Sequence, residues 1–472
     1  MSVFSASPLQ QPAMSAQAML AARMDRLPSS KVIWQMVILL SLGGFFETYE
    51  LFSTSFVIPG IIHSGVLTAS TAGLFDIHGA ASYIAATFIG MFIGTSCVSF
   101  VADRLGRRRV FIYALLGYCA CSLIMACQTD AMGLCFWRLM AGIGLGVELV
   151  TIDTYLGELV PPGIRGRAFA YNHVISYLAG PICGVCALLL VPHEPYGIEG
   201  WRWVIGLGTL GSLGVFLLRG RLPESPRWLA SRGHIDRAEQ IVAELERKSV
   251  LQTGRDLLSP TVTSLPPQEH KGHFSELWNR KYARRTFMLV IFHFFASIGV
   301  YGFMNWVPTF LIEQGVSVAH SLAYTIAMGC SAPLGPLLNS TFADKVERKW
   351  QIAGAALVMA IGGLAFAFVR EPSLVILCGV LVTVGSTVMS VSYHAYQSEL
   401  YPTRIRSQAV GFVYSFSRIS GMLSGFMIAF LLGHYGVISA LGLVAGSMVV
   451  VALIIGTMGP RTRGRTLEAI ND

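Results

Sequence analysis

The chain has 472 residues and a formal net charge of +8, with 53% hydrophobic residues and only 13% charged residues. Soluble proteins are about 25% charged, and the mean hydropathy of this chain is +0.59. These values exclude a string of soluble domains, a disordered chain, a coiled coil and a disulfide-linked scaffold. The nine cysteines all lie in or beside apolar segments, and we interpret them as small core residues.

Apolar runs that are long enough to cross a bilayer follow one another along most of the chain. A transmembrane helix needs about 20 apolar residues, and the sequence predicts twelve such spans. They cover residues 36–58, 76–100, 110–127, 135–157, 168–191, 201–218, 286–311, 321–342, 351–369, 374–396, 408–432 and 437–458. No removable signal peptide is predicted, because the first 31 residues are polar and lack the expected cleavage site.

The distribution of basic residues predicts how these spans are oriented. An even number of spans places both ends of the chain on the same side, and 30 of the 34 Lys and Arg residues fall in segments on that side. Cytoplasmic loops carry such an excess, so both termini are predicted to be cytoplasmic. The net charge of +8 is therefore interpreted as a topology signal, and no nucleic-acid partner is expected.

One long polar segment divides the spans six and six. It begins near PESPRWL at 223–229, contains a predicted helix at 234–248, and is too short for an enzyme domain. The predicted domains in chain order are a cytoplasmic amino-terminal segment (1–35), an N-terminal six-helix bundle (36–218), a cytoplasmic linker with short helices (219–285), a C-terminal six-helix bundle (286–458) and a cytoplasmic tail (459–472).

The two halves of the chain are copies of each other. ADRLGRRR at 102–109 returns as ADKVERK at 343–349, and ELVPPGIR at 158–165 returns as ELYPTRIR at 399–406, always at an interval of 241 residues. Secondary transporters are built from such repeats, with the ligand site near the midplane between them. The predicted fold class is therefore an all-α membrane protein with twelve transmembrane helices in two pseudo-symmetric six-helix bundles.

Both repeated motifs combine acidic and basic residues at the predicted cytoplasmic end of the spans. An acidic residue at a helix C-terminus is unfavourable for the helix dipole, so basic partners are expected nearby. We predict charge networks that hold the halves together when the cavity opens outward and break when it opens inward. The alternative for the basic residues is a purely topogenic role. The predicted network residues are Asp103, Arg107, Arg108, Glu158, Arg165, Asp344, Glu399 and Arg406.

These motifs resemble those of the major facilitator superfamily over the whole length of the chain. SFVADRLGRRR at 99–109 resembles the signature of the loop between spans 2 and 3, and PESPRWL resembles the sugar-porter, organic-ion and metabolite:proton symporter branches. ARMDRLP at 22–28 and FETYE at 46–50 resemble the bacterial metabolite symporters, which are similar to nicotinate and aromatic-acid carriers and to the synaptic vesicle protein 2 family. The resemblance implies a carrier in the bacterial inner membrane that works by alternating access.

Two carboxylates lie in the middle of the first span, where a charged residue is costly unless it has a function or a partner. Glu47 and Glu50 are three residues apart, so they are predicted to share one helical face. Two nearby carboxylates do not ionise together easily, so we predict that this pair binds a proton, with Asp153 as a relay. The alternative is a pair satisfied by donors from neighbouring helices. Glu148 lies five residues before Asp153, so the two cannot both face one cavity, and a structural partnership with another helix is one of the roles open to Glu148.

Arg418 lies in the middle of span 11, and a shift by 241 residues places it opposite Tyr177. Arg binds carboxylates through two parallel hydrogen bonds, so a central cavity that contains this guanidinium suits an organic anion. The mammalian organic-anion carriers that this branch resembles also have an Arg in the matching helix. The alternative is that Glu47, Glu50 or Asp153 neutralises Arg418 within the protein.

Aromatic side chains are predicted to form the walls of this cavity. Stacking faces around one cation favour a flat carboxylate such as a pyridine or benzene acid. Ordinary helix packing is the alternative for each residue taken alone, and Trp306 is also compatible with an anchor at the membrane interface. The predicted substrate-binding residues are Arg418, Tyr177, His173, Tyr301, Asn305, Trp306 and Tyr393.

The combined interpretation is proton-coupled uptake of a small organic anion, such as nicotinate or a similar aromatic carboxylate. Alternatives with the same fold are a sugar, polyol or organic-cation transporter and a proton-driven drug exporter, whereas a non-transporting receptor or scaffold is an alternative of another class. An enzyme is not expected, because the sequence has no nucleophile elbow, phosphate loop or metal cluster. The expected partners are the substrate, protons and the lipid bilayer, without a cofactor or metal, and the chain is expected to be monomeric.

Overall fold

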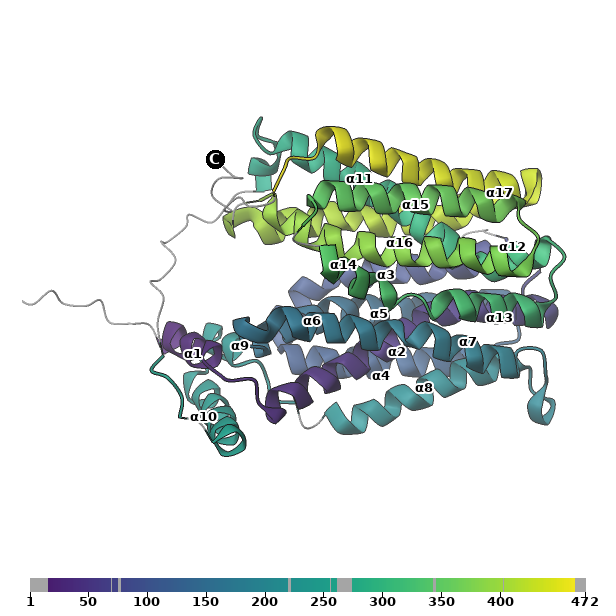
Figure 1. The fold of residues 1–472 in the computed structure, drawn as a ribbon. Coiled ribbons are helices and arrows are strands. Elements are labelled where there is room, and N and C mark those ends of the chain that lie inside the picture. Colours follow the sequence, from purple (N-terminus) through teal and green to yellow (C-terminus); the bar gives the residue numbers. More distant parts are fainter. Residues whose placement is uncertain are drawn as a thin grey trace, which may run out of the picture.

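The computed structural model describes residues 16–462 except 69, 75–77, 220–221, 255, 261–273, 343–344 and 402. Within these residues the secondary structure is helical, apart from one isolated bridge between Ala72 and His78. Most helices run along the long axis of the molecule, as Figure 1 shows. The predicted all-α fold class is confirmed by this arrangement.

The N-terminal half contains helices at the first six predicted spans. The fifth span is divided, because α6 ends at Tyr177 and α7 begins at Ala179. The helices of this half are α2 (Lys31–His63), α3 (Ala80–Leu105), α4 (Arg107–Ala126), α5 (Ala131–Leu159), α6 (Pro162–Tyr177), α7 (Ala179–Leu190) and α8 (Gly200–Arg219), with the short 3-10 helix η2 (Pro195–Gly197) before α8.

The C-terminal half contains helices at the last six predicted spans. Two of these spans are interrupted, the seventh at residues 305–306 and the eighth at residues 330–333. The second interruption includes Pro333, which has no N–H group to continue a helix. The helices of this half are α11 (Ala283–Met304), α12 (Val307–Glu313), α13 (Val318–Gly329), α14 (Leu334–Phe342), α15 (Arg348–Phe368), α16 (Pro372–Glu399) and α17 (Thr403–Met458), with η3 (Phe274–Trp278) before α11.

Nine helical segments of the described chain are long and apolar enough to cross a membrane, counting α6 with α7 and α13 with α14 as single spans. α17 contains two predicted spans, because the chain turns at Gly436, whose φ of 77° is a left-handed conformation that favours glycine. α3 and α8 lie at the predicted second and sixth spans. A helix or a pair of helices therefore stands at each of the twelve predicted spans.

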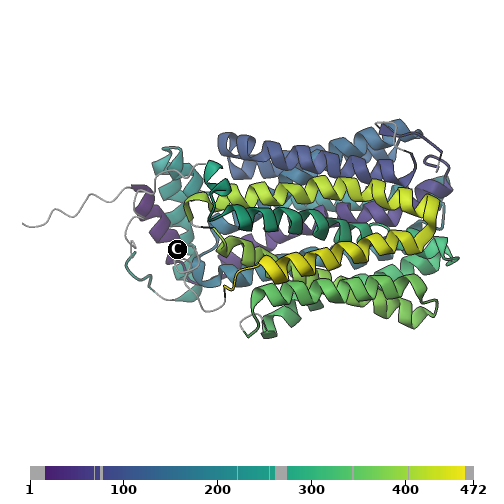
Figure 2. The same cartoon turned by 90° about the horizontal axis from the view of Figure 1, so that it is seen from above.

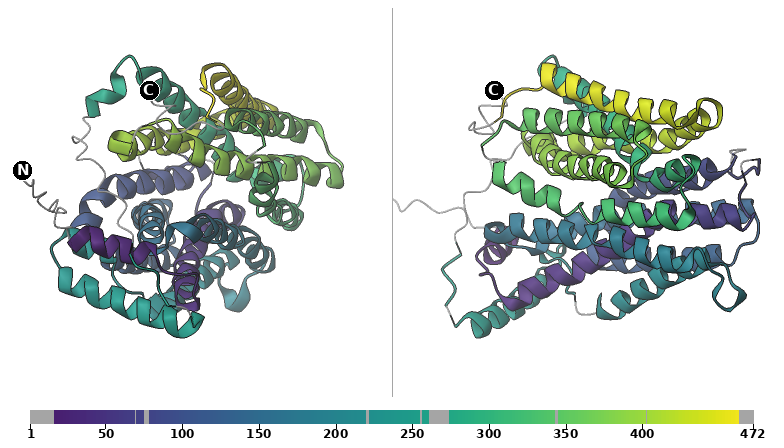
Figure 3. Two further views of the ribbon diagram at one scale, coloured as in Figure 1. Left: turned by 60° about the vertical axis from the view of Figure 1, so that its left-hand side comes forward. Right: turned by 45° about the vertical axis from the view of Figure 1, so that its right-hand side comes forward.

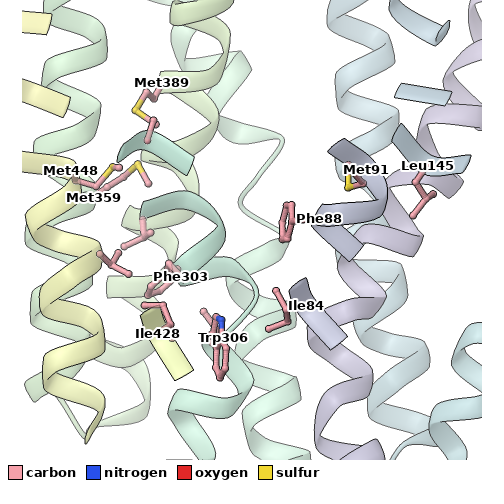
Figure 4. Packing of buried hydrophobic residues seen from close by; sticks show 14 of the residues in the cluster. Ile84, Phe88, Met91, Leu145, Phe303, Trp306, Met359, Met389, Ile428 and Met448 are labelled. Atoms are coloured by element: carbon pink, nitrogen blue, oxygen red, sulfur yellow. The ribbon is translucent and has the colours of Figure 1, made fainter. Parts of the chain in front are cut away.

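The two halves lie side by side (Figures 1 and 2) and pack through α3 with α17, α7 with α13, and α2 with α12. Ile84 and Phe88 project from α3 toward the C-terminal half (Figure 4). They meet glycines of α17: a Cβ atom at Gly421 would lie 3.0 Å from the Phe88 ring, and one at Gly425 would lie 3.3 Å from Ile84. Apolar side chains against small residues therefore form the contact between α3 and α17.

The packing of α3 on α5 depends on glycine within the N-terminal half. A Cβ atom at Gly90 of α3 would lie 2.2 Å from the Leu139 carbonyl oxygen, and one at Gly142 of α5 would lie 2.7 Å from the Thr87 carbonyl oxygen. Atoms at these distances overlap, so the backbones approach this closely only because both positions lack a side chain.

Gly90→Ala is expected to destabilise the protein, because the added methyl group has no room beside α5. Overpacking of this kind costs about 1–3 kcal/mol, so the melting temperature of the detergent-purified protein should fall. Gly117→Ala in α4 is the matched control, since nothing lies within 4 Å of its Cβ position and Ala is the better helix former. Equal melting temperatures for Gly90→Ala and the unmodified chain would contradict this contact.

Three helices form a small layer at one end of the bundle: α1 (Ala16–Asp25), α9 (Pro226–Ser231) and α10 (Ile235–Thr253). α10 confirms the helix predicted at 234–248 and continues to Gly254, whose φ is 63°. α1 adds a helix to the amino-terminal segment, where the sequence predicts none. Figures 1 and 3 show α1, α9 and α10 at the same end as the last turn of α17, which we term the α10 end.

α1 is attached to α10 by apolar and ionic contacts. Leu20 and Met24 share a buried cluster with residues of α10. Arg23 and Arg26 each donate to the Glu246 carboxylate at 2.7 Å. The hydrogen bond to Glu246 raises the pKa of Arg23 above its ordinary value. Burial alone would raise the pKa of Glu246, but the hydrogen bonds from Arg23 and Arg26 outweigh it, so that this pKa lies below its ordinary value.

Acidification is therefore expected to release α1 from α10. A carboxylate with a lowered pKa stabilises the folded state above its unfolded pKa, and this contribution is lost as the pH falls through the lower, folded-state value. Hydrogen-exchange protection factors of α1 should therefore be high near neutral pH and should drop below about pH 4. Glu246→Gln should lower the protection at neutral pH, whereas Glu244→Gln, which affects an exposed pair with Lys248, should not. Protection of α1 that is independent of pH would contradict the ionic contact.

Candidate functional site

A cavity of about 240 Å³ lies between the two halves. α2, α5 and α6 line it from the N-terminal half, and α11, α16 and α17 line it from the C-terminal half. Its ionisable and aromatic lining residues are Glu47, Phe52, Asp153, His173, Tyr177, Phe292, His293, Tyr301, Tyr393, His394 and Tyr414. The cavity is thus acidic on the side of the N-terminal half and mainly aromatic on the other side.

The two carboxylates of the first span lie in different places. Glu47 lines the cavity and is 8% exposed, whereas Glu50 is fully buried within the N-terminal half. The Glu50 carboxylate accepts a hydrogen bond from the Arg138 guanidinium at 3.2 Å, and both side chains are completely enclosed. The predicted shared face is therefore corrected: α2 directs Glu47 to the cavity and Glu50 to α5, so the two do not form a carboxylate pair.

Arg138 is a functional candidate that is not predicted from the sequence, because it lies near one end of the fourth span and resembles a flanking basic residue. Its guanidinium also donates to the Glu50 carbonyl oxygen and the Thr87 hydroxyl, each at 2.8 Å, and to the Thr54 hydroxyl. Its Cζ atom lies 5.1 Å from the centre of the Tyr83 ring. The sequence signal that leads to it is Glu50 itself, since a buried carboxylate requires a partner.

The fourth span places its two acidic residues as predicted. Asp153 is exposed to the cavity and interacts electrostatically with His173 of α6. Glu148 is fully buried and is not among the residues that line the cavity. The expectation that these two carboxylates face different directions is therefore confirmed.

Arg418 lies directly behind the cavity wall. It is 1% exposed, and its guanidinium donates to the hydroxyl groups of Tyr301 at 3.5 Å and Tyr414 at 3.4 Å, both of which line the cavity. Glu47 contributes an attractive charge from the opposite half. The buried Nε atom of Arg418 has no hydrogen-bond partner within the described residues. One phenol ring therefore separates the guanidinium from the cavity, and the Nε–H group of Arg418 can still donate a hydrogen bond.

Four of the other predicted substrate residues line the cavity, namely Tyr177, His173, Tyr301 and Tyr393. Asn305 and Trp306 do not, which corrects their predicted role. Both follow the end of α11 at Met304, where the chain turns before α12. The Trp306 ring stacks on Phe310 at 6.4 Å and belongs to the apolar core (Figure 4).

Further cavity residues were not predicted. Tyr414 lies one turn before Arg418 on α17, and His394 stacks on Tyr393 with ring centres 4.2 Å apart. Asn172 and Ser417 add polar groups to the lining. Helical spacing from Arg418 is the signal that leads to Tyr414, because residues four positions apart lie on one face of a helix.

The repeated motifs form the same ion pair in each half. Arg107 pairs with Glu158 at 3.3 Å, and Arg348 pairs with Glu399. The corresponding residues are 241 positions apart, which is the repeat interval. Arg348 was not among the predicted network residues, although a shift of Arg107 by this interval leads to it. Each pair joins two helices of the same half, α4 with α5 and α15 with α16.

The remaining network residues are only partly described. The side chains of Asp103, Arg165 and Arg406 and the whole of Asp344 lie outside the described residues. The backbone N–H of Arg108 donates to Glu224 at 3.0 Å, which connects the start of α4 to the PESPRWL segment. The predicted network between the halves stays a prediction.

The family model for sugar (and other) transporters matches residues 36–472. The chain belongs to this transporter family. YyaJ of Bacillus subtilis (strain 168), named for metabolite transport, is 30% identical over 95% of this chain and 96% of its own. The niacin transporter NiaP of Acinetobacter baylyi (strain ATCC 33305 / BD413 / ADP1) is 26% identical, and the match covers 96% of this chain and 99% of NiaP. The gallate transporter of Pseudomonas putida is 26% identical, and the match covers 89% of this chain and 88% of that protein.

The solved structures show the same fold. The partially occluded inward open conformation of the xylose transporter XylE from E. coli superposes with a TM-score of 0.73 and 20% sequence identity, covering 93% of this chain and all of that chain. XylE is a major facilitator superfamily protein. The family member described here is thus a multi-pass membrane transporter with the twelve-helix major facilitator fold, and it is not an enzyme.

Proposed function

We propose that this transporter couples the uptake of a small aromatic carboxylate, such as nicotinate, to the entry of protons. The observation that carries the proposal is the cavity between the halves, which combines carboxylates from one half with aromatic rings and a nearby guanidinium from the other. Such a cavity offers groups for both species that a proton-coupled anion carrier must bind.

Protons have two kinds of acceptor in the N-terminal half. Glu47 and Asp153 are carboxylates that a proton can reach through the cavity. Glu50 is instead held by Arg138 in a buried ion pair, and protonation of its carboxylate would remove the attraction that holds the pair. A buried pair whose attraction disappears on protonation is suited to couple proton binding to a change in helix packing.

The anion is held by the aromatic side of the cavity. Tyr301 and Tyr414 accept hydrogen bonds from Arg418 through their hydroxyl oxygens, so each hydroxyl hydrogen is available to a carboxylate in the cavity. The positive charge one ring behind these phenols favours a negative group at the same place. Tyr177, Tyr393 and His394 supply flat faces for the ring of the substrate.

The names of two relatives support this substrate class. One is a niacin transporter and another is a gallate transporter, and both of these substrates are carboxylic acids of flat aromatic rings. The fold likeness to XylE, described as a proton:xylose symporter, supports the coupling to protons.

The movement follows the alternating-access scheme of duplicated carriers. Each half would rotate as a unit about the central cavity, with its own ion pair between neighbouring helices intact. In the orientation that the basic residues predict, the α10 end faces the cytoplasm of a bacterium and the chain acts as a monomer in the inner membrane. Predicted networks around residues 103–109 and 344–349 would then meet when the cavity opens outward.

A ligand screen and a flux measurement together test this function. Nicotinate, benzoate and gallate are expected to raise the melting temperature of the purified protein, whereas xylose and choline are not. In proteoliposomes, uptake of the stabilising acid should make the external medium more alkaline. Stabilisation by xylose but by none of the aromatic acids would contradict the proposal, and substrate binding without any proton movement would contradict the coupling.

Organic-cation transport is the second candidate. The observation in its favour is that Glu47 and Asp153 line the cavity directly, whereas Arg418 is separated from it by two tyrosines. A cation would bind the carboxylates and compete with protons for them. Stabilisation by choline that weakens at acidic pH, with no response to carboxylates, would decide for this alternative.

A further inference from the structure

A second large cavity lies outside the transport site, at the α10 end of the molecule. It has a volume of about 770 Å³ and is enclosed by the first turns of α2, by α10 and by residues 222–224. Figures 1 and 3 show α10 beside the beginning of α2. None of the residues proposed to bind substrate or protons lines this groove.

One wall of the groove is apolar and belongs to a membrane span. Met36, Ile38 and Leu39 of α2 line it, and Ile38 is 47% exposed. The helix begins at Lys31 and its predicted span at residue 36, so these side chains lie in the first turn of the span. A water-soluble partner would have to enter the bilayer to cover them, whereas lipid chains are already present at this depth.

The other wall is polar and basic. Arg237 and Lys248 of α10 line it together with Arg108 at the start of α4, and two carboxylates, Glu224 and Glu244, lie among them. Glu244 pairs with Lys248 at 2.6 Å, and Glu224 accepts the backbone N–H of Arg108 at 3.0 Å. Three basic and two acidic side chains leave the groove with a net positive charge.

We propose that this groove binds one anionic phospholipid, with the headgroup against α10 and the acyl chains against α2. The two walls match the two parts of such a molecule, because basic pockets beside membrane spans bind anionic headgroups and apolar side chains favour the hydrocarbon. A dissolved anion would use the basic wall only. A zwitterionic phospholipid would use the apolar wall but carries no net charge to match the basic one.

Native mass spectrometry of the full chain in detergent tests the proposal with dioleoyl-phosphatidylglycerol, dioleoyl-phosphatidylcholine and inorganic phosphate as probes. Phosphatidylglycerol is expected to bind at one site at least about tenfold more tightly than phosphatidylcholine. The double variant Arg237→Gln/Lys248→Gln should weaken phosphatidylglycerol binding about tenfold to thirtyfold, on the scale of one basic side chain each near a membrane surface. Glu244→Gln should leave the affinity unchanged or raise it.

Arg247→Gln is the matched control, because Arg247 lies on the same helix, is exposed and does not line the groove. Its affinity for phosphatidylglycerol should equal that of the unmodified chain. An equal loss in this control and the double variant, equal binding of the two lipids, or an unaffected double variant would each overturn the proposal. Binding of inorganic phosphate with the same dependence on Arg237 and Lys248 would overturn it as well, since the site would then belong to a dissolved anion.

Discussion

Glu50→Gln is expected to abolish the proton-driven accumulation of substrate while sparing counterflow exchange. The amide of Gln cannot bind and release the proton, so the ratio of internal to external substrate should fall to about one under a proton gradient. Exchange of substrate for substrate requires no net proton movement and should continue. Accumulation and counterflow of radiolabelled substrate in the same proteoliposome preparation separate the two effects.

The partner of Glu50 makes stability a necessary control for this variant. Removing one member of a buried ion pair leaves an uncompensated charge and costs about 3–5 kcal/mol. The double variant Glu50→Gln/Arg138→Gln removes both charges and should recover stability without recovering accumulation. Glu47→Gln tests the cavity carboxylate separately, and Glu148→Gln, another fully buried carboxylate, should leave coupling intact. Accumulation that survives both Glu47→Gln and Glu50→Gln would show that the coupling residues are elsewhere.

Arg418→Lys is expected to weaken binding of the aromatic acid by about tenfold to a hundredfold, on the scale of lost hydrogen bonds to charged groups. Lysine keeps the charge but not the planar fork that reaches two phenols at once. The Arg418 guanidinium bonds Tyr301 and Tyr414 through two different nitrogens, at 3.5 and 3.4 Å, and the single nitrogen of an ammonium group does not reproduce that fixed spacing. Equilibrium binding of the labelled acid measures the change.

The tyrosines show whether Arg418 acts through them. Tyr414→Phe removes the hydroxyl and keeps the ring, so it should lower affinity in the same direction, and the double variant with Arg418→Lys should lose less than the sum of the two effects. Arg370→Lys, outside the cavity, is the matched control and should bind normally. Unchanged affinity in Arg418→Lys would move the carboxylate contact elsewhere, and tighter binding of organic cations would favour the second candidate function.

The spans could be predicted because each is a local run of apolar residues. The repeat could be predicted because its motifs recur at one fixed interval in the sequence. Apolar length marks each span, and even the turn at Gly436 falls between the predicted bounds 408–432 and 437–458. α1 could not be predicted in this way. A helix of 10 residues is marginal by itself, and it forms here against α10, more than 200 positions away in the chain.

The candidate site could be predicted only in part, since it depends on how each helix is rotated. Helical periodicity was sufficient for Asp153 and Glu148, which lie on the same regular helix. It was insufficient for Glu50, because the partner that holds its carboxylate is Arg138, 88 positions later. Trp306 shows a third case: the break after α11 changes the direction of the following side chains, and no spacing rule for a continuous helix applies there.

The ion pairs within each half bear on which parts of the protein can move during transport. Neighbouring helices of each bundle are joined by an ion pair, Arg107 with Glu158 in one half and Arg348 with Glu399 in the other. Each bundle therefore resists internal deformation. Relative movement must then occur where the two bundles meet, which includes α3 against α17 at Gly421 as well as α7 against α13 and α2 against α12. Within the described residues no hydrogen bond or ion pair joins α3 to α17, so one bundle can shift against the other there without breaking a directional bond.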